Sequence, residues 1–224
     1  DTDIFEASLD FGTQRYQFGF AVYASWFDNS DSSLTWQNPF GRVPGWDPSA
    51  GYPNGFGQAS LAPDNEAMQY RLYGGINFGQ SMRLSADVAL GTMDQDDTLL
   101  AYTVNPSLVV NTPLPRTSTG AKVDTTHANV RFTAKPLRRL SFLANYRLNE
   151  RDNRTAQDTW LRVQADADDQ VAAEDGRINL PFSYEKESWD ASATWRATRG
   201  LRIKGGVEFD DLSRSYSDVL DSDE

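Results

Sequence analysis

The chain has 224 residues, a formal net charge of −11 and no cysteine. The acidic charge argues against a nucleic-acid partner, because phosphate binding requires a basic surface. The lack of cysteine excludes a disulfide framework, a thiolate metal site and a cysteine nucleophile. Hydrophobic residues make up 39%, aromatic residues 12%, and the mean hydropathy is −0.58. This balance suits neither a soluble α/β enzyme nor a disordered chain, but a transmembrane barrel has it because only alternate residues face lipid.

Apolar and polar residues alternate with a period of two along the first half of the chain. A weak strand is predicted over residues 5–11, and a strong one over 16–26, where Tyr16, Phe18 and Phe20 begin the apolar face. After a long polar segment, 27–66, two further strands are predicted over 68–78 and 82–90. The turns within these two hairpins are short, at 12–15 and 79–81. Each hairpin therefore reads as a pair of antiparallel strands.

The second half repeats this layout. A polar segment at 93–123 leads to strands over 126–134 and 140–148, joined by the turn 135–139. A third long segment, 150–187, leads to strands over 189–197 and 201–210, joined by 198–200. Most of these eight predicted strands have about 10 residues, whereas globular strands average roughly 5–6. About 9–11 residues is the length that a tilted barrel strand needs to cross a membrane, while no run approaches the roughly 20 apolar residues of a membrane helix.

Short turns that alternate with long loops are typical of outer-membrane barrels, in which the short turns are periplasmic and the long loops extracellular. The sequence thus predicts an all-β, antiparallel transmembrane β-barrel in the bacterial outer membrane, with lipid as one partner. Both chain ends fall on the long-loop side, and residues 221–224 lack the aromatic final residue of an assembly signal. We therefore expect residues 1–224 to be a single internal segment that supplies about eight strands of a larger barrel.

The polar faces of the predicted strands carry the candidate functional side chains, which we expect to line the lumen and contact a partner. They are Arg71, Arg83, Asp87, His127, Arg131, Arg147, Asp190, Arg196 and Glu208. His127 is the only histidine. A polar lumenal residue is the preferred interpretation over a haem or zinc ligand, because one histidine cannot make a multi-histidine metal site.

No motif predicts catalysis. Two carboxylates of the polar faces could form a glycosidase pair, but they come from separate strands and no local pattern supports the pairing. The nucleophile-elbow, P-loop, dinucleotide and HExxH patterns are all absent. The sequence therefore predicts no enzyme and no catalytic residue.

Two acidic runs, at residues 94–97 and 166–175, raise the question of calcium. The second offers Asp166, Asp168 and Asp169, but Val171 stands where an EF-hand loop requires glycine. Solvated loop charge is the preferred interpretation, with loose divalent-cation binding near lipopolysaccharide as the alternative. No metal site is predicted.

Several segments together resemble one family. They are LTWQNPF at 34–40, LAPDN at 61–65, LPRTS at 114–118, KVDTT at 122–126, RLNERDNRT at 147–155 and NLPFSY at 179–184. Their order along most of the chain resembles the MtrB/PioB family of decahaem-associated outer-membrane proteins. Some members carry an N-terminal CxxC motif, which this chain lacks.

This resemblance implies a large barrel, of about 26 strands, that encloses a periplasmic multihaem c-type cytochrome. Electrons would cross the outer membrane through haems that the partner carries, in extracellular metal reduction or iron oxidation, and no cofactor would be bound by this chain. An extracellular cytochrome is a further candidate partner. Two other classes stay open: a general diffusion porin, with an open ion-conducting pore, and an extracellular β-rich adhesin, which would stay monodisperse without detergent.

Overall fold

The structure is a computed structural model, and it describes residues 1–37, 56–104, 110–161 and 176–216. All regular structure in these residues is β-strand. None of the described segments forms a helix of the length and apolar character that would cross a membrane. The acidic run at 166–175, which raised the question of calcium, lies outside the described residues.

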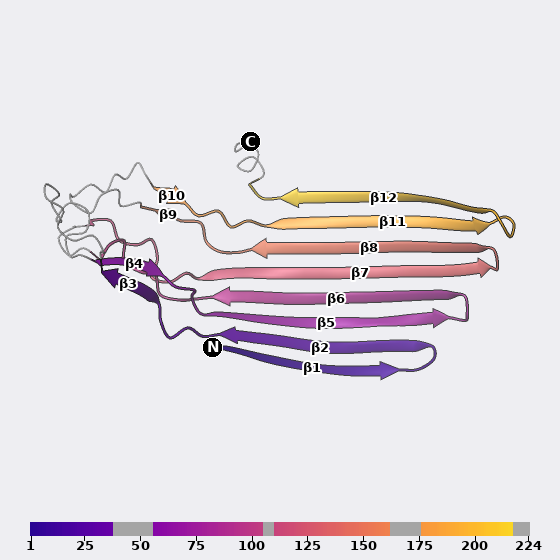
Figure 1. Cartoon of the computed structure of the whole chain (residues 1–224), viewed down its shortest axis with the longest axis horizontal. Coiled ribbons are helices and arrows are strands. Elements are labelled where there is room, and N and C mark those ends of the chain that lie inside the picture. Colours follow the sequence, from indigo (N-terminus) through magenta and orange to yellow (C-terminus); the bar gives the residue numbers. More distant parts are fainter. Residues whose placement is uncertain (38–55, 105–109, 162–175, 217–224) are drawn as a thin grey trace.

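Eight long strands form one antiparallel sheet in which each strand pairs with its neighbour along the chain (Figure 1). They are β1 (Thr2–Gly12), β2 (Tyr16–Phe27), β5 (Asn65–Phe78), β6 (Met82–Gln95), β7 (Ala121–Leu137), β8 (Leu140–Asn153), β11 (Tyr184–Arg196) and β12 (Arg202–Arg214). All eight predicted strands are thereby confirmed. Among the described residues β1 and β12 each pair on one side only, so the sheet is open.

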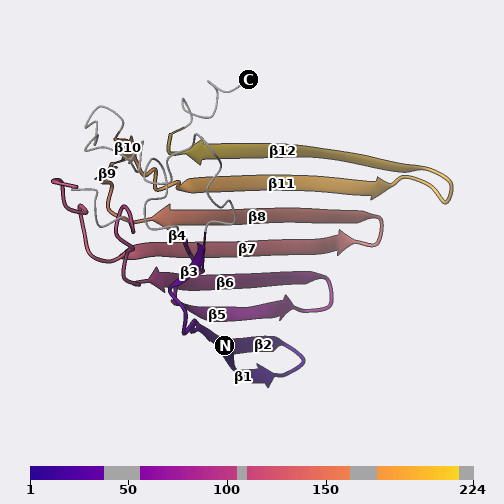
Figure 2. The ribbon, with the colours of Figure 1, turned by 60° about the vertical axis from the view of Figure 1, so that its left-hand side comes forward.

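The sheet is a single twisted layer, and no second layer of described residues packs on either face (Figures 1 and 2). Four small or β-branched residues, Ala24, Ala89, Val123 and Ala134, are the buried hydrophobic residues of the described chain. A soluble fold of this size buries many large apolar side chains in one core. This sheet has no such core.

All four short turns lie at one end of the sheet, and the long connections lie at the other (Figure 1). Gly79, with a φ of 69°, occupies the left-handed conformation in the turn between β5 and β6 that glycine adopts without strain. A β-bulge interrupts the pairing of β7 and β8 between Ala134 and Leu137. Pro136 lies inside this bulge, where its missing N–H breaks no ladder hydrogen bond.

The predicted loops need correction in two respects. First, β6, β7, β8 and β11 extend further toward the long-loop end than the apolar alternation does, so the loops are shorter than predicted. Second, the loops are not structureless. They contain a pair of strands, β3 (Ser33–Gln37) and β4 (Phe56–Ser60), a second pair, β9 (Thr159–Trp160) and β10 (Arg177–Ile178), and an isolated bridge between Thr98 and Ser118.

Candidate functional site

The strand register collects the apolar side chains on one face of the sheet, because directly opposite residues of an antiparallel pair point to the same side. One row of opposite residues, from β1 to β8, is Leu9, Phe20, Leu72, Val88, Ala128 and Leu148. The next row, from β1 to β12, is Phe11, Phe18, Gly74, Ala86, Val130, Tyr146, Trp189 and Phe209. We call this side of the sheet the apolar face and the opposite side the polar face.

Large side chains of the apolar face lie open to the surroundings. Leu72 is 60% exposed and Val207 75% exposed, and the rings of Tyr146 and Trp189 are in tilted contact with their centroids 4.2 Å apart. Water would penalise so large a continuous apolar surface, so it must meet lipid or another apolar body. The following apolar residues of the predicted strands all belong to this face: Tyr70, Leu72, Ile76, Leu84, Val88, Phe132, Phe142 and Trp195.

We call the belt of apolar side chains that crosses the strands on this face the apolar band. It runs obliquely to the rows of paired residues. The row of opposite residues that contains Val22 of β2 ends at Ser213 of β12. The apolar residues of β12 on this face, however, run only from Ile203 to Phe209. Within this stretch, Val207 corresponds in position to Val22 within the apolar residues of β2. The shift is about six residues, or about 20 Å, across six strand spacings of about 4.8 Å. The strands are therefore tilted by about 35° from the direction perpendicular to the band, which is within the range of strand tilts in outer-membrane barrels.

The height of the band also matches a membrane. On β2 it extends from Tyr16 to Trp26, about 33 Å along the strand. At a tilt of about 35° this corresponds to about 27 Å along the membrane normal, close to the apolar band of about 25 Å in outer-membrane barrels. The apolar face thus has both the height and the obliquity of a membrane-spanning wall.

Ion pairs border the band at the long-loop end of the same face. Asp94 accepts from Lys122 at 3.3 Å, and Arg154, just beyond β8, contacts Asp124 at 2.7 Å and Asp152 at 3.1 Å. The hydrogen bond to Asp152 and the charge of Asp124 raise the pKa of Arg154, so this side chain stays charged. Charged groups placed here fit the headgroup region rather than the hydrocarbon.

All nine predicted site residues lie on the polar face. Arg71 and His127 share one row, Asp87 and Arg147 the next, and Arg131, Asp190 and Glu208 the row after that. Arg83 follows one row further, and Arg196 lies nearest the short turns. The structure therefore brings these residues onto one surface, but it does not gather them into one cluster.

Several of these side chains are paired within the wall. Arg71 donates from Nε to both carboxylate oxygens of Asp87, at 3.1 and 2.9 Å, and also contacts Asp87 through Nη2. Asn145 donates to both oxygens of Asp190, and Arg147 lies 3.8 Å from the same carboxylate. His127 Nδ1 and Asn149 Oδ1 are 2.6 Å apart. Arg83 donates to Gln17 at 3.0 Å and to Asn77 at 3.3 Å.

Sequence reasoning missed one cross-strand contact, because it joins residues far apart in the chain. Tyr73 of β5 lies across Gly19 of β2, and its hydroxyl donates to Asp10 of β1 at 2.6 Å. A Cβ at Gly19 would come within 2.4 Å of the Tyr73 ring, so the contact requires glycine there. Arg71 in turn lies over the Tyr73 ring at 5.2 Å. The ring thus lies flat against the wall and does not project from it.

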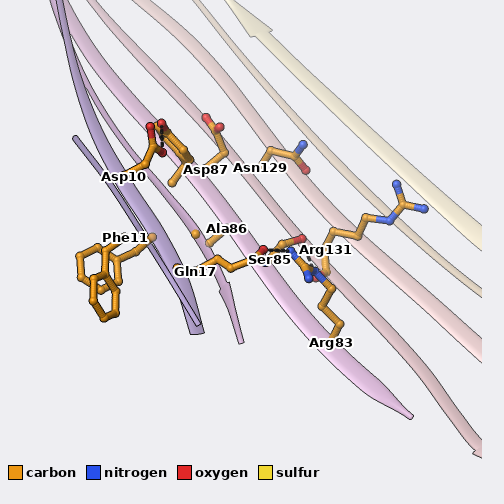
Figure 3. A pocket seen from close by; sticks show the side chains of 13 residues that line it. Asp10, Phe11, Gln17, Arg83, Ser85, Ala86, Asp87, Asn129 and Arg131 are labelled. Atoms are coloured by element: carbon orange, nitrogen blue, oxygen red, sulfur yellow. Dashed lines mark hydrogen bonds between the residues drawn. The ribbon is translucent and has the colours of Figure 1, made fainter. Parts of the chain in front are cut away.

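Figure 3 shows the side chains that line a hollow beside this contact, most of them from the polar face. Asp10, Gln17, Arg83, Asp87 and Arg131 line it, and Phe11 lies on the other side of the ribbons. Within the described chain, the guanidinium of Arg131 makes no hydrogen bond or ion pair with another side chain. The hollow holds no combination of nucleophile, base and oxyanion donors.

Three of the segments that carry the family resemblance, at 61–65, 114–118 and 179–184, contribute contacts within the long connections. Asp64 accepts from the backbone N–H of Asn29 at 2.7 Å. Asn179 accepts from the N–H of Asp158 at 2.8 Å and from Nε1 of Trp160 at 3.1 Å, and it donates to Ala156 O at 2.9 Å. Arg116 forms an ion pair with Asp158 at 3.1 Å and lies over the Trp160 ring. These side chains tie together segments that are distant in sequence.

The described residues hold no group of three or more histidine, cysteine, aspartate or glutamate side chains placed to bind a metal ion. The acidic residues of the first run, at 94–97, engage other protein groups in part. Asp94 pairs with Lys122, and Asp97 accepts from the N–H of Thr98 at 2.6 Å. This geometry favours loop charge over a built cation site in that run.

An antiparallel sheet with a lipid-height apolar face and short turns at one end defines a membrane-spanning β-barrel protein of the outer membrane. The family described as "Putative outer membrane beta-barrel porin, MtrB/PioB" matches residues 1–224, and the chain belongs to this family. It is 26% identical over 225 residues to the outer membrane protein MtrB of Shewanella baltica (strain OS185). That alignment covers 100% of this chain and 30% of the relative, so the chain spans about a third of the relative's length.

Proposed function

We propose that the full-length protein is a barrel that encloses a multihaem c-type cytochrome and lets electrons cross the outer membrane. Residues 1–224 form one segment that contributes eight strands to the barrel wall. The partner carries the haems, and this chain binds no cofactor and catalyses no reaction. The family resemblance suggests extracellular metal reduction or iron oxidation as the purpose, and an extracellular cytochrome as a further partner at the long-loop end.

The observation that carries this proposal is the combination of small residues and internally paired charges on the polar face, which would be the lumenal side. Small residues occupy it on β2, β5, β6, β11 and β12: Gly19, Ala21, Gly75, Ser85, Ala89, Gly91, Ser188, Ser192 and Gly206. Long side chains between them, such as Tyr73 and Arg71, lie along the wall and bond to it. A wall of mixed charge, partly paired within itself, suits a closely fitting protein, since such interfaces need complementary shape and potential.

The open sheet supports a barrel larger than this segment. Edge strands cannot stay unpaired in lipid, so β1 and β12 need neighbours from elsewhere in the full-length chain. The relative from Shewanella baltica is long enough to supply them, since the aligned part is 30% of its length. Barrel diameter grows with strand number, so a large barrel has room for a protein in its lumen.

Proteoliposomes test the electron-conduit proposal. The full-length barrel is inserted into vesicles that enclose a redox dye, with or without the multihaem cytochrome that co-purifies with it. Barrel and cytochrome together should pass electrons from an external reductant to the dye, and the barrel alone should not. No haem protein in the purified complex, or equal dye reduction by the barrel alone, would contradict the proposal.

The second candidate is a diffusion porin, and the family description favours it. Planar-bilayer conductance separates the two functions. An open porin should conduct ions steadily without a cytochrome, whereas a cytochrome-filled barrel should conduct little until the partner is removed.

A further inference from the structure

The short-turn end of the sheet carries a cluster of cations without carboxylates. Lys135, Arg138, Arg139, Arg196 and Arg202 line one depression there, between the β7–β8 and β11–β12 turns, and we call these residues the basic rim. All five are exposed. None of them takes part in an ion pair within the described residues, in contrast to Arg71, Arg116 and Arg154.

The absence of carboxylates extends beyond the rim to the residues on both sides of every short turn. Residues 11–27, 67–86, 125–149 and 191–207 contain no aspartate or glutamate, although the chain as a whole carries a net charge of −11. These four segments meet at the short-turn end of the sheet. The aspartate and glutamate residues are therefore confined to the strand segments farther from the short turns and to the long connections. The short-turn end of the sheet is basic, whereas the acidic residues lie toward the long-loop end.

Backbone pairing forces the arginines of the rim together. Arg196 stands directly opposite Arg202, and its N–H donates to the carbonyl of Arg139 at 2.7 Å. Arg139, in the turn directly before β8, thus forms one row with Arg196 of β11 and Arg202 of β12. Like charges directly opposite each other destabilise a sheet. Such a row is tolerated most readily when an external anion neutralises it.

The rim belongs to the polar face. Leu140, Trp195 and Ile203, which alternate with Arg139, Arg196 and Arg202, lie in one row on the apolar face. The side chains of these three arginines therefore lie on the side away from lipid. A phospholipid headgroup would meet the apolar side of the wall, whereas a body in or below the lumen would meet the basic rim.

We propose that the basic rim docks an acidic surface of a periplasmic protein at the mouth of the barrel. From Lys135 on β7 to Arg202 on β12 the rim spans three strand spacings, about 14 Å, which is too broad for one small anion and suits several carboxylates on a protein surface. Arginine pairs with carboxylates in a planar, bidentate geometry, and the short-turn end of outer-membrane barrels faces the periplasm. The inference rests on the proposed function in taking the polar face as lumenal.

Peptide binding to the full-length barrel in nanodiscs tests the rim without a cytochrome. The probe is a labelled deca-glutamate peptide, with deca-glutamine as the uncharged comparison. The variant R139Q/R196Q/R202Q removes the row of arginines. The variant R151Q/K186Q/R214Q removes the same charge from the same face of β8, β11 and β12 at the long-loop end.

The wild-type barrel should bind deca-glutamate more tightly than deca-glutamine, and added salt should weaken the binding. The rim variant should bind deca-glutamate about tenfold more weakly, since three exposed ion pairs are lost, and the matched variant should stay within about twofold. Heat-modifiable migration of both variants shows that they are folded.

Three results would overturn the proposal. They are the absence of charge-selective binding, an equal loss in both variants, and a rim variant that keeps its peptide affinity but loses bound phosphatidylglycerol. The last result would assign the cluster to lipid. A barrel that binds the peptide but never co-purifies with haem would refute the electron-conduit proposal and leave the rim intact.

Discussion

At the scale of single residues, the odd or even position of a residue in its strand alone decides whether its side chain lies on the apolar or the polar face. Val88 and Asp87 are neighbours in the chain, yet Val88 belongs to the apolar row of Leu72 and Asp87 pairs with Arg71 on the other side. Nothing from the described chain covers the Val88 side, where a charge would have to enter lipid. The same charge on the polar face would meet water and other polar groups.

Val88→Arg should therefore destabilise the full-length barrel by about 2–4 kcal/mol, the cost of arginine near the bilayer midplane. Urea unfolding in lipid vesicles, followed by tryptophan fluorescence, measures this loss. Asn129→Arg, on the polar face opposite Asp87, is the matched control and should change stability little. An equal loss in both variants would show that Val88 does not face hydrocarbon.

The glycine under Tyr73 gives a second prediction at this scale. Gly19→Ala should cost about 1–3 kcal/mol, because the new Cβ displaces the ring and breaks its hydrogen bond to Asp10. Gly205→Ala is the control, since a Cβ there meets nothing within 4 Å, and it should stabilise the strand by about 0.5 kcal/mol. If the two substitutions have the same effect in urea unfolding, the ring does not depend on Gly19.

At the scale of elements, the eight long strands could be predicted because lipid on one side and polar groups on the other impose a period of two. The strand ends could not. Beyond Leu90 and before Thr126 the alternation stops, but backbone pairing continues to Gln95 and Ala121 with Lys122 and Asp94 in contact. The short pairs β3–β4 and β9–β10 are too brief to show a period, and both serve to organise the loops.

The candidate site was predictable only in part for a similar reason. Parity placed the nine polar residues on one face, but it carries no information on register between strands. The contact of Tyr73 with Asp10 joins residues 63 apart in sequence, and the row of Arg139, Arg196 and Arg202 depends on the pairing of three strands. Such cross-strand juxtapositions require the three-dimensional sheet.

The hydrogen bonds of Asn179 in the third long connection lead to a prediction about the stability of that loop. Asn179→Ala removes three side-chain hydrogen bonds that join the two sides of the third long connection, so local opening should become easier. Trypsin should then cleave after Arg177 about tenfold faster in the native barrel. Asn111→Ala, at an exposed position of the second connection, is the control and should leave the rate unchanged. An unchanged rate in Asn179→Ala would show that its contacts do not hold the loop.

At the scale of the whole molecule, the oblique band fixes how the wall stands in the membrane. The depth of a residue in the membrane should follow the oblique apolar band and not the rows of directly opposite residues. Val22 and Ser213 share a row, but Ser213 lies beyond the end of the band on β12. Val22 and Val207 stand three rows apart, yet a tilt of about 35° places them at the same depth.

Single introduced cysteines can measure the depth of each position in the membrane, since residues 1–224 contain no native cysteine. In the full-length barrel, with any other cysteine replaced, Val22→Cys and Val207→Cys should carry a fluorophore that brominated lipid quenches equally. Ser213→Cys should be about 16 Å nearer the outer surface along the normal, so it should escape quenching and react with a water-soluble maleimide. If Ser213→Cys is quenched like Val22→Cys while Val207→Cys is not, the strands stand along the membrane normal. The tilt, and with it the match between this sheet and a closed outer-membrane barrel, would then be wrong.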